Sequence, residues 1–247
     1  MPIIYLSPST QEYNPYINGG NEELYMNLIA DAMEPYLYAS GIAFVRNTPS
    51  MNAASSIQQS NMGNYDLHLA LHSNAAPPYL SGQLQGSDVY YYQNSTNGKI
   101  AADIIADNLK SIYPNPSLVK TVATTTLGEV VRTKAPAVLI EFAYHDNYQD
   151  AQWIKDNIDN IAKNVVLSLT EYFGIPFETP FNDFNGIGYV RTNGSNLFIR
   201  NKPSFTGEII GKIPNNSPVR IIASYDEWYN IIYNGINGFV YQNYIEV

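Results

Sequence analysis

The chain has 247 residues, of which 45% are hydrophobic and only 14% are charged, and its formal net charge is -9. This acidic balance excludes nucleic acid as an expected partner, because phosphate backbones are bound by clusters of Lys and Arg. The absence of cysteine excludes disulfides and thiolate catalysis, and no run approaches the roughly 20 apolar residues of a membrane span. Asn, Ser, Thr and 21 Tyr supply much of the polarity, which suits carbohydrate-rich surroundings.

Residues 1–173 alternate short apolar runs with helical periodicity, which predicts an α/β domain with a mostly parallel sheet flanked by helices. The first helix should begin after the N-cap Asn21 and kink or end at Pro35. Two later helices are expected over residues 100–112 and 154–169, which carry apolar stripes at helical spacing. The expected strands are residues 3–6, 42–46, 66–72, 87–92 and 137–141.

Residues 174–185 hold two prolines and no steady period, so we interpret them as a linker. In residues 186–247 the pattern changes to short alternating strands with turn residues at close intervals, which predicts a small all-β barrel. The dipeptides Asn193-Gly194 and Asn234-Gly235 are typical of tight hairpin turns. The expected strands are residues 186–191, 196–200, 209–213, 218–224, 228–233 and 236–241.

Ionisable side chains stand at the predicted ends of two strands, where α/β sheets build their sites. His72 ends one strand and Glu141 ends another, while Glu23 lies in the first turn of the first helix. Zinc accepts both imidazole nitrogen and carboxylate oxygen, and a Glu that is not a ligand takes the proton of the activated water. These three residues therefore predict a zinc hydrolase site, with Glu22 as the neighbour that a one-residue error in register would select.

The same segments, in the same order, resemble the zinc-dependent N-acetylmuramoyl-L-alanine amidases. The Glu-x-x-x-Asn-Leu pattern of that family matches residues 23–28, and its Ser-x-His-x-Asn-Ala pattern matches residues 70–75 except at the leading Ser. Its Pro-x-Val-Leu-x-Glu pattern matches residues 136–141, followed by Asn147. The resemblance implies cleavage of the amide between N-acetylmuramic acid and L-alanine, with Zn²⁺ as cofactor, Glu23 and His72 as metal ligands and Glu141 as general base.

The chain departs from the family at the first metal ligand, a His in a Gly-His-Gly turn. Residues 7–11 read Ser-Pro-Ser-Thr-Gln instead. The missing ligand is expected to be either Gln11 or His145, and both alternatives stay open. His68 is expected to be structural or to support His72, because two residues four apart in a strand are separated by about 13 Å and cannot share one ion.

Two further residues are candidates for substrate binding in this domain. Asn74 follows His72 and either contacts substrate or forms a turn. Arg132 precedes the strand of Glu141 and either holds a substrate carboxylate or lies on the surface.

Residues 186–247 resemble the bacterial SH3 domain. Residues 197–204 are a variant of its Leu-Asn-Val-Arg-x-x-Pro-Ser signature, and the later residues follow the domain in order. The resemblance implies a module that holds the enzyme near wall peptides. Tyr225, Trp228 and Tyr241 are expected to form an aromatic binding groove or, alternatively, the core and rim of the barrel.

These resemblances imply a secreted or cell-wall protein with peptidoglycan as its partner. Because residues 1–6 predict a strand and not a signal peptide, we expect either a signal that has been removed or release of the kind that phage lysins use. Two other functions stay open. One is a wall-binding protein without catalysis, suggested by the missing His, and the other is a zinc peptidase that cuts within the stem peptide.

Overall fold

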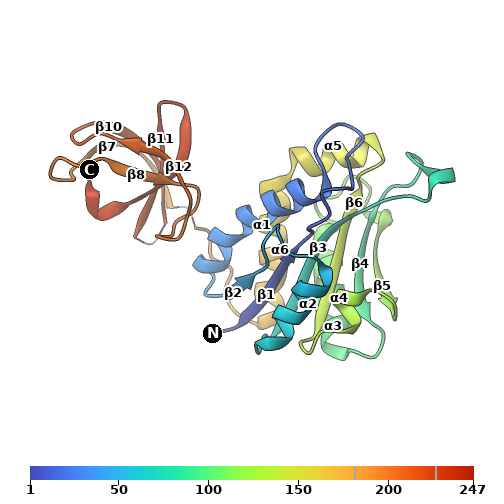
Figure 1. The fold of residues 1–247 in the computed structure, drawn as a ribbon. Coiled ribbons are helices and arrows are strands. Elements are labelled where there is room, and N and C mark those ends of the chain that lie inside the picture. Colours follow the sequence, from blue (N-terminus) through green and yellow to red (C-terminus); the bar gives the residue numbers. More distant parts are fainter. Residues whose placement is uncertain (181, 226) are drawn as a thin grey trace. The chain divides into compact units, whose positions relative to one another are not determined.

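The computed structural model describes residues 1–180, 182–225 and 227–247, which form two compact units (Figure 1). The first unit comprises residues 1–177 and the second residues 178–247, so the chain divides inside the segment interpreted as a linker. The first unit is a six-stranded sheet covered by helices, and the second is an all-β sheet. Within the described ranges, no helix is both long enough and apolar enough to cross a membrane.

The sheet of the first unit is mostly parallel, as predicted. Its strand order is β2-β1-β3-β6-β4-β5, and only β4 and β6 pair antiparallel. Residues 75–86 connect β3 to β4 without an α-helix, and a parallel return needs a crossover that is usually helical. The strands are β1 (Ile3–Pro8), β2 (Ala43–Arg46), β3 (Leu67–Asn74), β4 (Ser87–Tyr92), β5 (Val119–Thr124) and β6 (Ala137–Tyr144).

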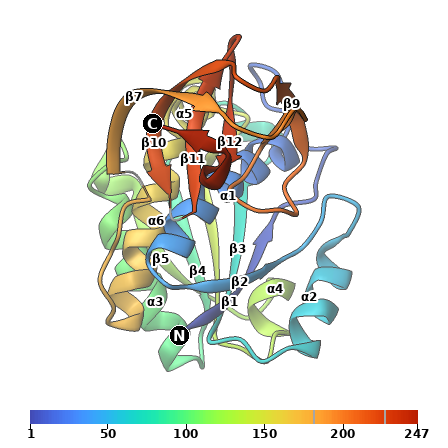
Figure 2. The ribbon, with the colours of Figure 1, turned by 90° about the vertical axis from the view of Figure 1, so that its left-hand side faces the viewer.

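Helices cover both faces of this sheet. Figure 2 shows α3 and α6 on one side of the strands and α2 and α4 on the other. The helices are α1 (Glu22–Ala39), α2 (Ala53–Met62), α3 (Thr96–Leu109), α4 (Gly128–Val131), α5 (Tyr148–Asp156) and α6 (Ile158–Phe173), with short 3-10 turns at η1 (Pro78–Leu80) and η2 (Pro116–Leu118). The expected helix over residues 154–169 is divided at Asn157, whose side chain donates a hydrogen bond to the carbonyl of Trp153.

The alternative that the first helix ends at Pro35 is wrong, because α1 continues to Ala39. A proline inside a helix costs about 3 kcal/mol. Each fully buried apolar side chain contributes about 1.5–3 kcal/mol, and one side of α1 packs such side chains into the core against α6. Burial therefore outweighs the cost of the proline. The fully buried residues of this stripe are Met26, Ile29, Met33 and Leu37.

The two faces of the sheet differ in chemistry because alternate residues of each strand point to opposite sides. Leu69, Leu71 and Ile140 belong to the apolar core under α1, α3, α5 and α6. The intervening residues His68 and His72 of β3 are also buried, but on the face that α2 and α4 cover. This second face, called the polar face below, also carries a small apolar cluster around Ala70 and Leu139, and the candidate site lies on it.

The second unit is all-β, as predicted, and in its described part the strands follow the antiparallel order β13-β7-β10-β11-β12-β8-β9. Asn193 and Asn234 have positive φ angles of 54° and 50°, as tight Asn-Gly turns require. The strands are β7 (Asn182–Val190), β8 (Leu197–Arg200), β9 (Ile209–Ile213), β10 (Pro218–Tyr225), β11 (Trp228–Tyr233), β12 (Ile236–Tyr241) and β13 (Ile245–Glu246), with a 3-10 turn at η3 (Gln242–Tyr244).

Candidate active site

A row of three ionisable residues crosses the polar face of the sheet. His72 on β3 is in register with Glu141 on β6, and Glu141 is in register with Asp88 on β4. Residues in register on neighbouring strands present their side chains on the same face. The structure therefore brings together His72 and Glu141, which the sequence placed at the ends of two separate strands.

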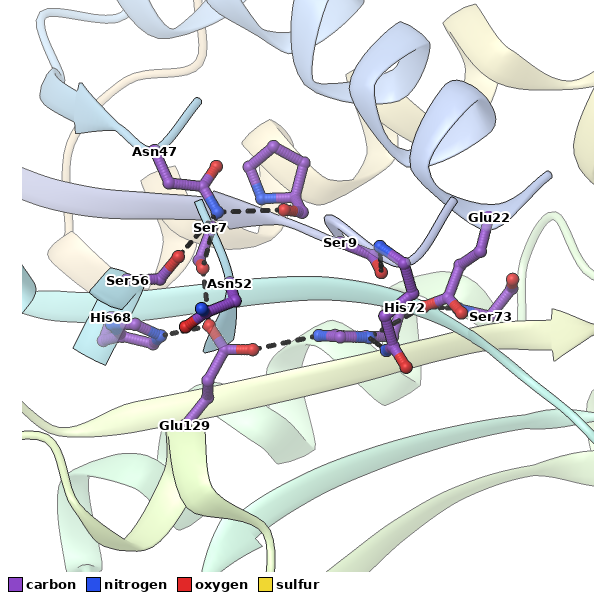
Figure 3. Close-up of polar contacts among 12 residues, drawn as sticks. Ser7, Ser9, Glu22, Asn47, Asn52, Ser56, His68, His72, Ser73 and Glu129 are labelled. Atoms are coloured by element: carbon purple, nitrogen blue, oxygen red, sulfur yellow. Dashed lines mark hydrogen bonds and ion pairs between the residues drawn. The ribbon is translucent and has the colours of Figure 1, made fainter. Parts of the chain in front are cut away.

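His72 is held at both ring nitrogens by buried carboxylates (Figure 3). Its Nδ1 lies 2.8 Å from Oε1 of Glu22, and its Nε2 lies 3.1 Å from Oε2 of Glu129. Burial lowers the pKa of His72, but the hydrogen bonds to Glu129 and Glu22 outweigh it and hold that pKa well above its usual range. In the metal-free molecule, His72 is thus a cation between two anions.

The same contacts shift the pKa values of the two carboxylates in the opposite direction. Burial raises the pKa of Glu129, but hydrogen bonds with His68 and His72 hold it well below the usual range. Burial also raises the pKa of Glu22, and the hydrogen bond and charge of His72 again outweigh it and lower the pKa. Both carboxylates are therefore ionised at neutral pH.

At the start of α1 the structure turns Glu22 towards His72, whereas Glu23 was the residue predicted from the sequence as a metal ligand. The side chain of Asn21 caps α1 by accepting a hydrogen bond from the backbone N–H of Leu24 at 2.8 Å, which fixes where the helix begins. Successive helical residues are rotated by about 100°. Glu22 consequently turns inward to His72, whereas Glu23 is only partly buried, and its backbone carbonyl accepts from Asn27.

Glu141 is a partly buried residue whose carboxylate lacks full hydrogen bonding. Its Oε2 atom has no hydrogen-bond partner among the residues that the structure describes. Burial raises the pKa of Glu141 to about 8; the positive charge of His72 opposes this, and the negative charges of Glu22 and Asp88 reinforce it. A carboxyl group that titrates near neutral pH is suited to accept and return a proton in a reaction.

The two candidates for the missing ligand both border this cluster. Gln11 places its Nε2 atom 3.3 Å from Nδ1 of His72, on the side of Glu22. His145 is buried, stacks on Tyr16, and points its Nδ1 at the Ser73 carbonyl oxygen, 2.9 Å away. The structure therefore brings Gln11 directly to His72, and it brings His145 to the adjacent residue of β3.

The donor types present fit a zinc ion in part. Glu22 and His72 offer a carboxylate and an imidazole nitrogen side by side, which are ligands that zinc prefers. Across the described ranges, no group of three or more His, Asp or Glu side chains is arranged to hold a metal ion. A catalytic zinc site has about three protein ligands, so Glu22 and His72 alone do not make a complete one.

Asn74 and Arg132, the two predicted substrate contacts of this domain, occupy different places. Asn74 ends β3, and its side chain accepts from the N–H of Ala75, as in a turn. Arg132 is exposed at the end of α4, and its carbonyl accepts from Asn61 at the C-terminal end of α2. Because α2 ends just before β3 begins, Arg132 lies at the opposite end of β3 from His72, which favours its surface alternative.

An aromatic cluster in the second unit borders a cavity of about 390 Å³. Trp228 and Tyr241 line it together with Phe205, whose ring centroid lies 5.0 Å from that of Trp228 and 4.9 Å from that of Tyr241. Tyr225 is buried and is not among the lining residues, so its alternative as part of the core is favoured. Sequence reasoning missed Phe205, which follows the Pro-Ser of the signature.

Comparisons with known proteins agree with this geometry. The model of the N-acetylmuramoyl-L-alanine amidase family matches residues 10–171, and that of the bacterial SH3 domain matches residues 195–246. None of the curated proteins matches the chain significantly.

Several solved structures share the fold of the first unit. The amidase AmiC2 of Nostoc punctiforme is 14% identical with a TM-score of 0.61, over 70% of this chain and 97% of that one. An amidase from Clostridium difficile 630 is 15% identical with a TM-score of 0.62, and the match covers 70% of this chain and 97% of that one. The catalytic domain of the CD27L endolysin, which targets Clostridia difficile, is 24% identical with a TM-score of 0.56. That match covers 69% of this chain and 97% of the other.

The match of the family model over most of the chain agrees with the ordered motifs and with the row that His72 and Glu141 form. The second unit has the all-β sheet that a bacterial SH3 domain requires. The chain therefore belongs to the N-acetylmuramoyl-L-alanine amidase family and carries a C-terminal bacterial SH3 domain.

Proposed function

We propose that the first unit hydrolyses the amide bond between N-acetylmuramic acid and L-alanine of peptidoglycan at the face that carries His72 and Glu141. The observation that carries this proposal is the position of Glu141, which lies in register with His72 and has a buried, unpartnered Oε2 atom and a pKa of about 8. Membership of the amidase family supports the same reaction.

We also propose that Zn²⁺ is the cofactor, held by Glu22 and His72 with Gln11 or His145 as the third ligand. When bound, zinc would polarise the amide carbonyl and lower the pKa of water towards neutrality. Glu22 and His72 are the two zinc-type donors already in contact, at 2.8 Å. Nδ1 of His72 loses its proton when it binds a metal, so binding is expected to be weaker at low pH.

In this reaction Glu141 takes a proton from the attacking water and returns it to the leaving amine of L-alanine. The carbon–nitrogen bond breaks, the lactyl group of N-acetylmuramic acid becomes a carboxylate, and the stem peptide leaves with a free amine. A general base contributes about 10²–10⁴ in rate. The Glu141→Gln variant should therefore keep its fold and lose activity by about that factor.

The test is mass spectrometry of purified peptidoglycan digested with the zinc-supplied protein, with Glu141→Gln as the control. The proposal expects intact stem peptides with a free L-alanine amine, which the control does not release. Cuts within the stem peptide would show that the protein is a peptidase and not an amidase. No release at any zinc level or pH would identify a wall-binding protein without catalysis.

The second unit is proposed to bind the cell wall through the cavity that Phe205, Trp228 and Tyr241 line. Aromatic side chains there offer a large contact area at a low cost in conformational entropy. Linking such a module to the catalytic unit raises the local concentration of the enzyme at its substrate. The proposed place of action is accordingly the cell wall.

A further inference from the structure

Behind His72 lies a buried carboxylate that the proposed reaction does not use. Glu129 belongs to the short helix α4 and is only 6% exposed. Its Oε2 atom lies 3.1 Å from Nε2 of His72, and its Oε1 atom lies 3.3 Å from Nε2 of His68. Figure 3 shows His72 between Glu22 on one side and Glu129 on the other.

The two histidines that contact Glu129 are four residues apart on β3 and point to the same face of the sheet. The single carboxylate of Glu129 reaches the Nε2 atoms of both. His68 is fixed in turn at its Nδ1, which lies 2.9 Å from the hydroxyl oxygen of Ser60 on α2. His68 thus anchors Glu129, and Glu129 contacts His72.

Further contacts hold Glu129 from the neighbouring strand. The hydroxyl of Ser7 on β1 donates to Oε1 at 2.5 Å. Asn47 binds the hydroxyls of Ser7 and of Ser56 on α2, at 3.3 and 3.0 Å. Residues from β1, β3 and α2 therefore fix the orientation of one carboxylate. Stability alone gives no reason for this arrangement, because apolar residues often replace a buried ion pair without loss.

The hydrogen-bonding chemistry of the carboxylate determines which nitrogen of His72 is available. An ionised carboxylate only accepts hydrogen bonds, so Nε2 of His72 must carry the proton that it donates to Glu129. Nδ1 is then the nitrogen that faces Glu22 and Gln11. Histidines that bind metal usually donate the other ring N–H to such a partner, which sets the tautomer and the ring orientation.

We propose that Glu129 is the positioning residue of this site, which holds His72 with a proton on Nε2 so that only Nδ1 can bind the metal. The proposal rests on the proposed zinc-dependent function. It assigns Glu129 no contact with substrate, and it assigns His68 and Ser7 the role of holding the Glu129 carboxylate.

The experiment measures zinc affinity of the full chain by competition with a chromophoric chelator. Glu129→Gln keeps the size of the side chain and removes its charge, and loss of such a supporting residue costs about 10–100-fold in metal affinity. The matched control is Glu34→Gln, since Glu34 is also buried and pairs with Arg46 at 2.8 Å. The control is expected to bind zinc as tightly as the wild type.

Nuclear magnetic resonance gives a second readout that needs neither activity nor metal. The chain has only three histidines, so the ring nitrogens can be assigned by substitution. The Nε2 proton of His72 should be protected from exchange in the wild type, with and without zinc. In Glu129→Gln that protection should be lost.

Equal zinc affinity in Glu129→Gln and the wild type would overturn the proposal, and so would an equal loss in the Glu34→Gln control. An Nε2 of His72 that carries no protected proton in the wild type would overturn it as well, even where the variant fails to fold. A wild type that binds no zinc but keeps the protected proton would refute the proposed cofactor and leave the assignment of Nε2 to Glu129 supported.

Discussion

Glu141 lies in register with His72, and its buried Oε2 atom has no partner within the described part of the chain. With a pKa near 8 instead of the ordinary 4.5, the folded metal-free protein binds a proton that the unfolded chain has already lost. The free energy of unfolding contributed by this group therefore falls as pH rises from about 4.5 to about 8, by at most about 1.4 kcal/mol per pH unit.

The Glu141→Gln variant should remove this pH dependence, because the amide does not titrate. We expect its free energy of unfolding to exceed that of the wild type by more at pH 8 than at pH 5. Urea unfolding in the presence of a chelator at pH 5, 6.5 and 8 measures the difference. A difference that stays constant over this range would show that Glu141 is ionised in the folded protein at all three values.

Glu22 and Glu23 provide a matched pair at the start of α1. Glu22→Gln should lose at least about 10-fold in zinc affinity, because it removes the charged donor beside Nδ1 of His72. Glu23→Gln removes the same charge one residue away and should bind zinc like the wild type. Isothermal titration of zinc into both variants decides which of the two residues binds the metal. Weaker zinc binding by the Glu23 variant would support the original sequence prediction.

At this scale the sequence was informative about strands and less so about helices. His72 and Glu141 were singled out because each follows an apolar run of a strand, where an ionisable residue is conspicuous. Glu22 and Glu23 differ only in rotation about the helix axis, and the cap at Asn21 fixes that rotation. Glu129 carries no local signal, since it meets His72 across 57 residues of sequence.

Among the elements, the connection over residues 75–86 is the one most closely tied to the site. The carboxylate of Asp146 accepts hydrogen bonds from the N–H groups of Ala76 and Gly82, at 3.1 and 3.0 Å. Asn147 donates to the carbonyl of Gly82 at 2.8 Å. The turn after β6 thereby holds the loop that follows His72 and Asn74.

Asp146→Ala should loosen this loop while the sheet stays intact. Hydrogen bonds to a charged group contribute about 1.5–3 kcal/mol, so amide exchange at Ala76 and Gly82 should become markedly faster. Hydrogen exchange followed by mass spectrometry measures it, with the exposed Asp156→Ala as control. Unchanged protection of residues 75–86 would mean that other contacts hold the loop.

The elements that sequence reasoning missed are those with weak periodicity. The helix α2 is rich in Ser, Gln and Asn, and α4 has only four residues, so neither shows an apolar stripe. The strand β5 is short and mixes apolar residues with Lys and Thr without regular alternation. The strands with long apolar runs, β3 and β6, were found within a few residues of their ends because they are buried on both faces.

For the molecule as a whole, the two units predict two separable activities. Phe205 is 63% exposed beside Trp228 and Tyr241. The Phe205→Ala variant should therefore bind purified cell walls more weakly, measured as the fraction of protein that sediments with them. Hydrolysis of a soluble muropeptide should stay unchanged, because the first unit is untouched. Ile187→Ala, which is 62% exposed and does not line the cavity, is the control. Equal wall binding by both variants would place the binding surface elsewhere.

The cap at Asn21 also limits how the family sequence can vary in length. Residues 9–20 join β1 to the start of α1, and insertions or deletions there can be absorbed by the connection. An insertion between Asn21 and Glu22 would instead rotate the carboxylate by about 100° away from β3. We therefore expect related chains to differ in the length of this connection but to keep an acidic residue directly after the capping residue.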